Sequence, residues 1–130
     1  MYSYKVEQAI RAATILHQNQ VRMGAIAIPY ISHLIAVVLI LRDYTTDEDI
    51  LSAALLHDTL EDTDYTNEEL IEDFGKSVAE MVTTLTEPSD SDHGKLAWSE
   101  RKGAYIKQLK TANEGALMIA AADKTHNFRT

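Results

Sequence analysis

Two histidines and two aspartates of this chain occur in segments whose other residues are mostly apolar. His33 lies within one such segment, the adjacent pair His57 and Asp58 follows a second, and Asp123 belongs to a third. Imidazole and carboxylate groups are ligands that Mn²⁺, Fe²⁺ and Zn²⁺ share in proteins, and the chain has no cysteine that could supply a thiolate. These residues are therefore candidate ligands of one divalent metal ion.

The helix expected around His57 places acidic residues on its apolar side. At about 100° per residue, His57 and Glu61 fall on the same side of that helix as Ile50. Asp58 and Asp62 lie beside two of its leucines. We expect the imidazole and the three carboxylates to project into the interior or the wall of a cleft. Burial without compensation would be costly because each ion loses its hydration, and a divalent cation supplies that compensation.

Each candidate also has a structural explanation when it is considered alone. A single buried histidine such as His33 is more often a hydrogen-bonded core residue than a metal ligand. Asp123 could cap a helix or pair with Lys124. Glu61 and Asp62 could form an acidic helix end that faces water. Their joint occurrence, on the buried rows of separate helices, favours the metal site.

The spacing of apolar residues predicts helices almost throughout the chain. No segment alternates convincingly with period two, so we expect an all-α fold, a compact multi-helix bundle around the metal site with no sheet. A length of 130 residues with 45% hydrophobic residues fits a single domain over residues 1–130. The expected helices cover approximately residues 4–18, 29–42, 45–61, 67–73, 76–85, 98–109 and 114–128.

Two helix starts depend on particular residues. Pro29 suits the first position of a helix, because its missing N–H is not needed there. Thr45 and Glu48 have the spacing of a capping box for the helix that leads to His57. In that helix Ser52 and Thr59 mark the side expected to face solvent.

The composition argues against several kinds of partner. A formal net charge of -8 is unlike that of a protein that coats nucleic acid, which needs clustered Lys and Arg. The N-terminal segment lacks the apolar core of a signal peptide. The apolar run over residues 31–41 is far shorter than the ~20 residues that span a bilayer. We expect a soluble cytoplasmic protein without membrane contact, and the sequence leaves an oligomer open.

Three motifs, in this order, resemble the HD superfamily. The four candidate ligands match its H…HD…D pattern. More narrowly, the chain resembles the hydrolase domain of the Rel/SpoT proteins and the small alarmone hydrolases, through PYISH (29–33), HDTLEDT (57–63) and ADKTHNFRT (122–130). The resemblance extends from residue 17 to the last residue, where that family continues with further helices.

The resemblance implies a function for the site. It implies an all-α fold, an Mn²⁺ ion on the four candidate ligands, and removal of the 3′-pyrophosphate from (p)ppGpp. It implies that Glu61 and Asp62 serve catalysis rather than metal binding, and that Arg22 and Asn127 line the nucleotide site. The polyphosphate needs positive partners, and Lys124 is one further candidate.

We expect attack on a phosphoryl group by a hydroxide held on the metal. Glu61 would orient or deprotonate the water, and Asp62 would assist proton delivery. Alternatively, both carboxylates support the imidazole ligands from outside the coordination sphere.

Two further alternatives concern the substrate. Residues 23–28 are apolar where the alarmone hydrolases have a polar stretch, which favours another nucleotide, a mono- or triphosphate. A non-catalytic nucleotide-binding sensor module is the third alternative, and the intact pair Glu61 and Asp62 counts against it.

Overall fold

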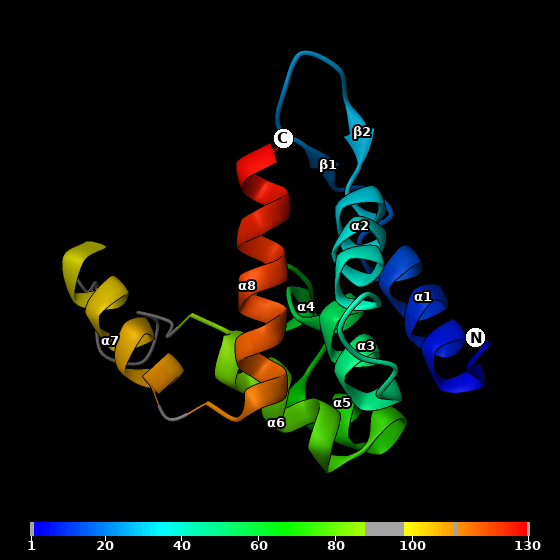
Figure 1. Ribbon diagram of the computed structural model, residues 1–130. Coiled ribbons are helices and arrows are strands. Elements are labelled where there is room, and N and C mark those ends of the chain that lie inside the picture. Colours follow the sequence, from blue (N-terminus) through cyan, green and yellow to red (C-terminus); the bar gives the residue numbers. More distant parts are fainter. Residues whose placement is uncertain (1, 88–97, 111, 130) are drawn as a thin grey trace.

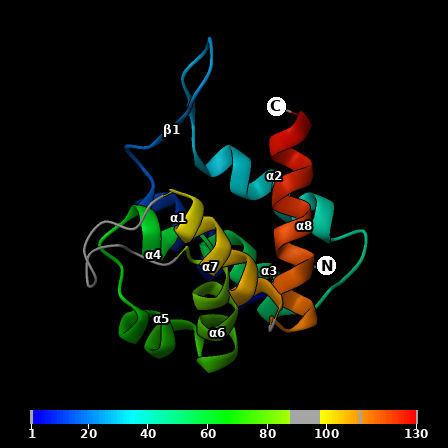
Figure 2. The same cartoon turned by 90° about the vertical axis from the view of Figure 1, so that its left-hand side faces the viewer.

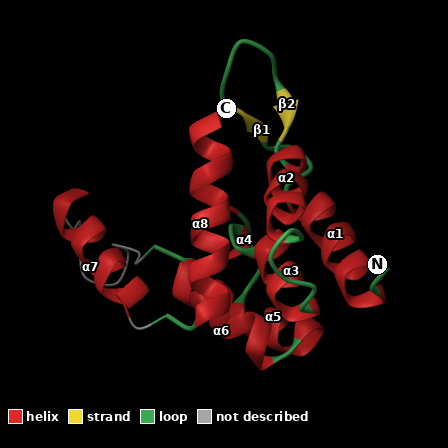
Figure 3. Cartoon of the chain, viewed as in Figure 1, coloured by secondary structure: helices red, strands yellow, loops and turns green. Residues whose placement is uncertain are grey.

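The computed structural model describes residues 2–87, 98–110 and 112–129, and it confirms the all-α class. Its helices pack as a bundle with a small strand pair at one end (Figures 1 and 3). In chain order the elements are α1 Tyr4–Leu16, β1 Val21–Arg22, β2 Ile28–Pro29, α2 Ile31–Leu41, α3 Glu48–Leu56, α4 Thr59–Asp62, α5 Asn67–Phe74, α6 Lys76–Leu85, α7 Trp98–Lys110 and α8 Glu114–Arg129.

The helix α3 is the centre of the bundle. It contacts α1, α2, α6 and α8, and its residues from Leu51 to Leu56 are all buried. Ser52 and Thr59 are 0% exposed, so the expectation that they face solvent is wrong. The physical reason is that neighbouring helices cover this segment on every side, and a helix so placed has no solvent face. The Thr59 hydroxyl donates to the Leu56 carbonyl at 2.6 Å, which satisfies its donor inside the core.

The start of α3 also differs from the expected capping box. The side chain of Asp47, not that of Thr45, caps the helix by accepting from the backbone N–H groups of Asp49 and Ile50. The hydroxyl of Thr45 instead accepts from the N–H of Asp47 at 3.1 Å. Aspartate is as good a cap as threonine or better, and it adds a negative charge at the positive end of the helix.

A short antiparallel ladder departs from the expectation of no sheet. Val21 pairs with Pro29, and Arg22 pairs with Ile28. Pro29 therefore does not begin a helix, and α2 starts two residues later, after Tyr30. The N–H of Tyr30 donates to the carbonyl of Gln20 at 2.8 Å, which continues the extended pairing up to the helix. Proline is tolerated at this edge position because no backbone N–H is needed there for the pairing.

Two helices that are far apart in the sequence pack against each other in this bundle. α2 and α8 contact each other and run in opposite directions (Figure 1). The first turn of α2 therefore lies beside the last turns of α8. Helix α7 lies to one side of the bundle (Figure 1), in contact with α6, and faces the viewer in Figure 2. The side-chain amide of Gln108 holds it there by donating to the carbonyls of Thr83, Thr84 and Thr86.

The remaining boundaries agree with the sequence to within a few residues. A capping box occurs at the start of α5, where Thr66 and Glu69 cap each other's backbone. Gly75 separates α5 from α6 with a φ of 93°, a conformation that L side chains rarely adopt. Residues 88–97, most of the connection between the helices expected at 76–85 and 98–109, lie outside the described residues. Within the described part of the chain, no helix has the length and apolar character that crossing a bilayer requires.

Candidate metal centre

The chain interrupts its helix at the two residues that carry metal-ligand groups. α3 ends at Leu56, and α4 begins at Thr59. Asp58, between them, has φ -96° and ψ 0°, a sparsely populated backbone region that occurs often at functional sites. The expectation of one helix to Glu61 is therefore wrong at this point.

The side chain of His57 is fixed by this interruption. Its Nδ1 lies 2.6 Å from the carbonyl oxygen of Ala54. Because a carbonyl oxygen only accepts, Nδ1 carries a proton and donates it. The other ring nitrogen, Nε2, is buried and has no hydrogen-bond partner among the described residues.

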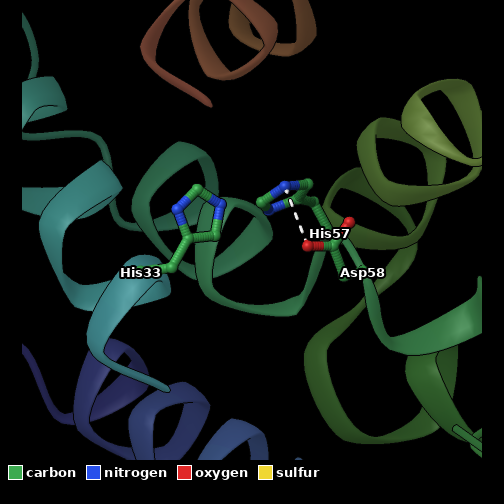
Figure 4. A group of neighbouring side chains, drawn as sticks. All are labelled: His33, His57 and Asp58. Carbon is green, nitrogen blue, oxygen red and sulfur yellow. Dashed lines mark ion pairs between the residues drawn. The ribbon is translucent and has the colours of Figure 1, made fainter. Parts of the chain in front are cut away.

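Three other groups surround that nitrogen. His57 Nε2 lies 3.4 Å from Oδ2 of Asp58 and 3.3 Å from Oδ1 of Asp123. The same Asp123 oxygen lies 2.7 Å from Nε2 of His33. Ligand atoms of His33, His57 and Asp58 all lie within 4.8 Å of one another (Figure 4). Residues from α2, α8 and the α3–α4 junction thus bring two imidazoles and two carboxylates together.

This donor set fits a divalent ion. A buried polar atom without a partner is unusual in folded proteins, and a ligating lone pair explains it. Donors bound at about 2.1 Å in octahedral geometry are separated by roughly 3 Å along each edge, close to the observed separations. Nitrogen and carboxylate oxygen together suit Mn²⁺, Fe²⁺ or Zn²⁺.

The electrostatics of the cluster favour a positive charge at its centre. Burial alone would lower the pKa of His57, but Asp58 and Asp123 outweigh it and raise that pKa to about 9. Burial would raise the pKa of Asp123, but the nearby imidazoles of His33 and His57 lower it below the ordinary range. The field that holds a proton on His57 equally favours a metal ion in its place.

Tyr30, which is not among the site residues predicted from the sequence, supports the cluster from the side. Its hydroxyl donates to Oδ2 of Asp58. Burial, followed by the charge of Asp58, raises the pKa of Tyr30 far above its usual value, so the phenol stays protonated and remains a donor. Its ring packs between His17 and His33, with centroid separations of 5.2 and 5.5 Å. The sequence signal was present, because Tyr30 lies one helical turn before His33 in PYISH.

The two candidate catalytic carboxylates lie at the edge of the cluster. Glu61 and Asp62 are both exposed, so they do not project into the interior, whereas Asp58 is half-buried. Asp62 instead lines a surface recess together with Gln18 and Gln20. The break after Leu56 explains the difference, because α4 does not continue the face of α3. Glu61 accepts from the backbone N–H of Glu87. Partial burial nevertheless raises the pKa of Glu61.

A hydrogen-bonded chain holds Asp62 in place. Its Oδ2 accepts from the side-chain amide of Gln20 at 3.2 Å. The Gln20 Oε1 lies 2.7 Å from Nδ1 of the buried His17. A carboxylate cannot donate, so Gln20 presents its NH₂ to Asp62 and its oxygen to the imidazole. The type and sequence position of Gln20 alone carry no signal of this role.

The three residues expected to contact substrate do not all lie beside the metal-ligand cluster. Arg22 Nη1 donates to Oδ1 of Asn127 at 3.0 Å, and Asn127 Nδ2 donates to Oδ2 of Asp123 at 3.3 Å. These two candidates therefore adjoin the cluster. Lys124 is exposed and lines a separate recess with Phe128 and other residues at the end of α8.

The model of a protein family described as "HD domain" matches residues 6–130. The chain belongs to this family, whose helical fold and H…HD…D ligand pattern agree with the geometry above. HD-domain hydrolases depend on a metal, which agrees with the possible His/His/Asp site.

Among its relatives is the guanosine-3′,5′-bis(diphosphate) 3′-pyrophosphohydrolase of Haemophilus influenzae. The two are 38% identical over 120 residues, which cover 88% of this chain and 17% of that protein. The human 3′-pyrophosphohydrolase MESH1 is 40% identical over 115 residues, covering 87% of this chain and 62% of the relative. The chain thus spans about a sixth of the bacterial relative's length.

One solved structure is similar over almost the whole chain. It is described as a metazoan ortholog of SpoT that hydrolyzes ppGpp and plays a role in starvation responses. The TM-score is 0.88 at 34% sequence identity, over 99% of this chain and 71% of that one.

Proposed function

We propose that this protein is a metal-dependent phosphohydrolase that removes the 3′-pyrophosphate from (p)ppGpp, with Mn²⁺ as its metal. The observation that carries the proposal is the buried Nε2 of His57, which faces Asp58 and Asp123 and makes no hydrogen bond within the part of the chain that the structure describes. The relatives named above, at 38 to 40% identity, are 3′-pyrophosphohydrolases of guanosine bis(diphosphate) by name. That activity is what this site would perform.

The metal ligands in this proposal are His33, His57, Asp58 and Asp123. An ion held there would lower the pKa of a water molecule to ~7 and neutralise phosphate charge. His57 donates from Nδ1 to a backbone carbonyl, which keeps its Nε2 lone pair available. Tyr30 holds the Asp58 carboxylate in one orientation.

Glu61 and Asp62 are the proposed catalytic pair. Both lie on α4, immediately after the ligand pair, and both are accessible from solvent. The raised pKa of Glu61 makes its carboxylate a better proton acceptor than an ordinary glutamate. Asp62, held by Gln20, would assist proton delivery to the leaving group.

The nucleotide would lie between the cluster and the strand pair. A cavity of about 440 Å³ there is lined by Arg22, the following loop and His126. We propose Arg22 and Asn127 as substrate contacts, and Lys124 as an additional positive group for the polyphosphate. Since Lys124 lines a different recess, its contribution would depend on a phosphate that reaches over α8.

One observation favours a different nucleotide as substrate. The loop between β1 and β2 exposes apolar side chains, with Met23 96% and Ile26 73% accessible. Such a loop offers few hydrogen bonds to a guanine edge. The second candidate function is therefore hydrolysis of a nucleoside mono- or triphosphate by the same metal centre.

One assay separates these functions. The purified protein is incubated with Mn²⁺ and, separately, with ppGpp, GTP, deoxynucleoside triphosphates and nucleoside monophosphates. Release of pyrophosphate from ppGpp alone supports the first function, and selective cleavage of another nucleotide supports the second. Absence of turnover by the folded, metal-loaded protein would instead indicate a non-catalytic sensor.

Matched variants test the residue assignments in the same assay. We expect Glu61→Gln to retain Mn²⁺ but lose most turnover, whereas Glu72→Gln, exposed on α5, should behave like the unaltered protein. His57→Ala should lose both the metal and the activity. Retention of either by His57→Ala would contradict the assignment of the ligands.

A further inference from the structure

The metal-ligand candidate His33 makes a direct contact with a second histidine. Nδ1 of His33 lies 2.7 Å from Nδ1 of His126, and the ring centroids are 4.9 Å apart. His33 is 1% exposed, so no bulk water can serve its ring nitrogens. Its other nitrogen, Nε2, faces Asp123 in the metal cluster. Each nitrogen of this buried ring therefore has one specific partner.

The number of protons on the two imidazole rings determines which Nδ1 donates and which accepts. A neutral imidazole carries one proton, on one of its two nitrogens. If Nε2 of His33 offers its lone pair to a metal ion, the proton must be on Nδ1. That Nδ1–H then points at Nδ1 of His126, which has to accept it. His126 must accordingly be neutral, with its own proton on Nε2.

We infer that His126 is a positioning residue of the metal centre, which fixes His33 in the tautomer that binds metal. Ligating histidines almost always donate their second N–H to a carboxylate, a carbonyl or water, and this bond orients the ring and raises its basicity. In this protein another imidazole takes that role. This inference depends on the metal centre of the proposed function but not on its substrate.

The location of His126 gives this contact a second consequence. His126 lies on α8, about one helical turn after the candidate ligand Asp123. It also lines the cavity beside Arg22 and the apolar loop. The same ring therefore touches a metal ligand on one side and the proposed nucleotide cavity on the other. A group that filled this cavity would press on the residue that orients His33.

Metal affinity without substrate is the first test. Mn²⁺ binding is measured by titration calorimetry for the unaltered protein, His126→Leu, His126→Asn and Thr125→Val, an exposed neighbour on α8. We expect His126→Leu to bind about 10- to 100-fold more weakly. Asparagine carries an acceptor oxygen near the position of Nδ1, so His126→Asn should recover most of the affinity. Thr125→Val should bind normally.

The outcomes separate this inference from the metal site itself. If the unaltered protein binds no Mn²⁺, the metal centre and the role of His126 both fail. If it binds Mn²⁺ and His126→Leu binds equally well, only the role of His126 fails. Equal losses in His126→Leu and His126→Asn would also contradict it, because the acceptor would then be irrelevant.

A second measurement uses the unaltered protein and does not depend on how the variants fold. Nitrogen-15 spectra of the histidine side chains are recorded with Zn²⁺, which is diamagnetic. We expect the Nδ1 signal of His33 and the Nε2 signal of His126 to be protonated, and Nδ1 of His126 to be unprotonated. A proton on Nδ1 of His126 in the Zn²⁺-bound protein would overturn the inference.

Discussion

Oδ1 of Asp123 lies 2.7 Å from Nε2 of His33, although the two residues are 90 positions apart. The contact joins the first turn of α2 to the C-terminal half of α8. Because these helices run antiparallel, the packing of α8 along α2 decides whether Asp123 reaches the cluster. Both the candidate metal centre and the stability of the bundle therefore depend on the same interface.

Metal binding should stabilise the folded protein. An ion that binds only the folded state at 100 times its dissociation constant adds about 2.7 kcal/mol to the free energy of unfolding. In a domain of this size, that should raise the thermal midpoint by roughly 10 °C. Asp123→Asn should abolish the Mn²⁺-dependent rise in calorimetry, and Asp64→Asn, exposed after α4, should retain it. An equal rise in both variants would place the ion elsewhere.

The phenol of Tyr30 should contribute to metal affinity. Tyr30→Phe removes the hydrogen bond to Asp58 with almost no change in volume. We expect the Mn²⁺ dissociation constant to rise about 10-fold or more, as for other groups that orient a ligand. Tyr65→Phe is a close control, because that hydroxyl also donates to an aspartate, Asp73, at 2.6 Å. Similar affinities in the two variants would argue against a role for Tyr30.

Gln20 should affect the reaction rather than the fold. Gln20→Met preserves the length of the side chain and removes the donor to Asp62. Misplacing a catalytic group by about 1 Å can cost ~100-fold, so we expect kcat to fall 10- to 100-fold while KM changes little. Gln18→Met, at an exposed position in the surface recess that Gln20 and Asp62 also line, should leave kcat unchanged. A rise in KM alone would indicate that Gln20 contacts substrate instead.

The start of α8 should be sensitive to one added methyl group. A Cβ on Gly115 would lie 2.8 Å from Sδ of Met81 and 2.9 Å from Cγ1 of Ile50. Overpacking costs about 1–3 kcal/mol, and the better helix propensity of alanine offsets ~1 kcal/mol of it. Gly115→Ala should therefore lower the free energy of unfolding by roughly 1 kcal/mol in urea titrations.

Gly103 on α7 provides the control for this substitution. Apart from its chain neighbours and its own helix backbone, no atom of the described residues lies within 4 Å of a Cβ built there. Gly103→Ala should gain the propensity without the clash, so it should be as stable as the unaltered protein or more stable. If Gly115→Ala proved the more stable of the two, the close packing of α8 against α3 and α6 would be contradicted.

The order and type of the helices followed from the sequence because apolar spacing is a local property. The donors His33, His57, Asp58 and Asp123 could be selected in the same way, since a polar group in an apolar row is visible without coordinates. The sequence also carried the family's ligand pattern. Both predictions require only knowing which residues point to the same side of one helix.

The relations between elements were decided by the tertiary structure. The break at His57 and Asp58, the burial of Ser52 and the exposure of Glu61 depend on how neighbouring helices cover the α3–α4 segment. The contacts of Gln20, Tyr30 and His126 join residues of separate elements at hydrogen-bond distance. Such contacts arise only when packing fixes the helices in three dimensions, and periodicity along one helix carries no information about its neighbour.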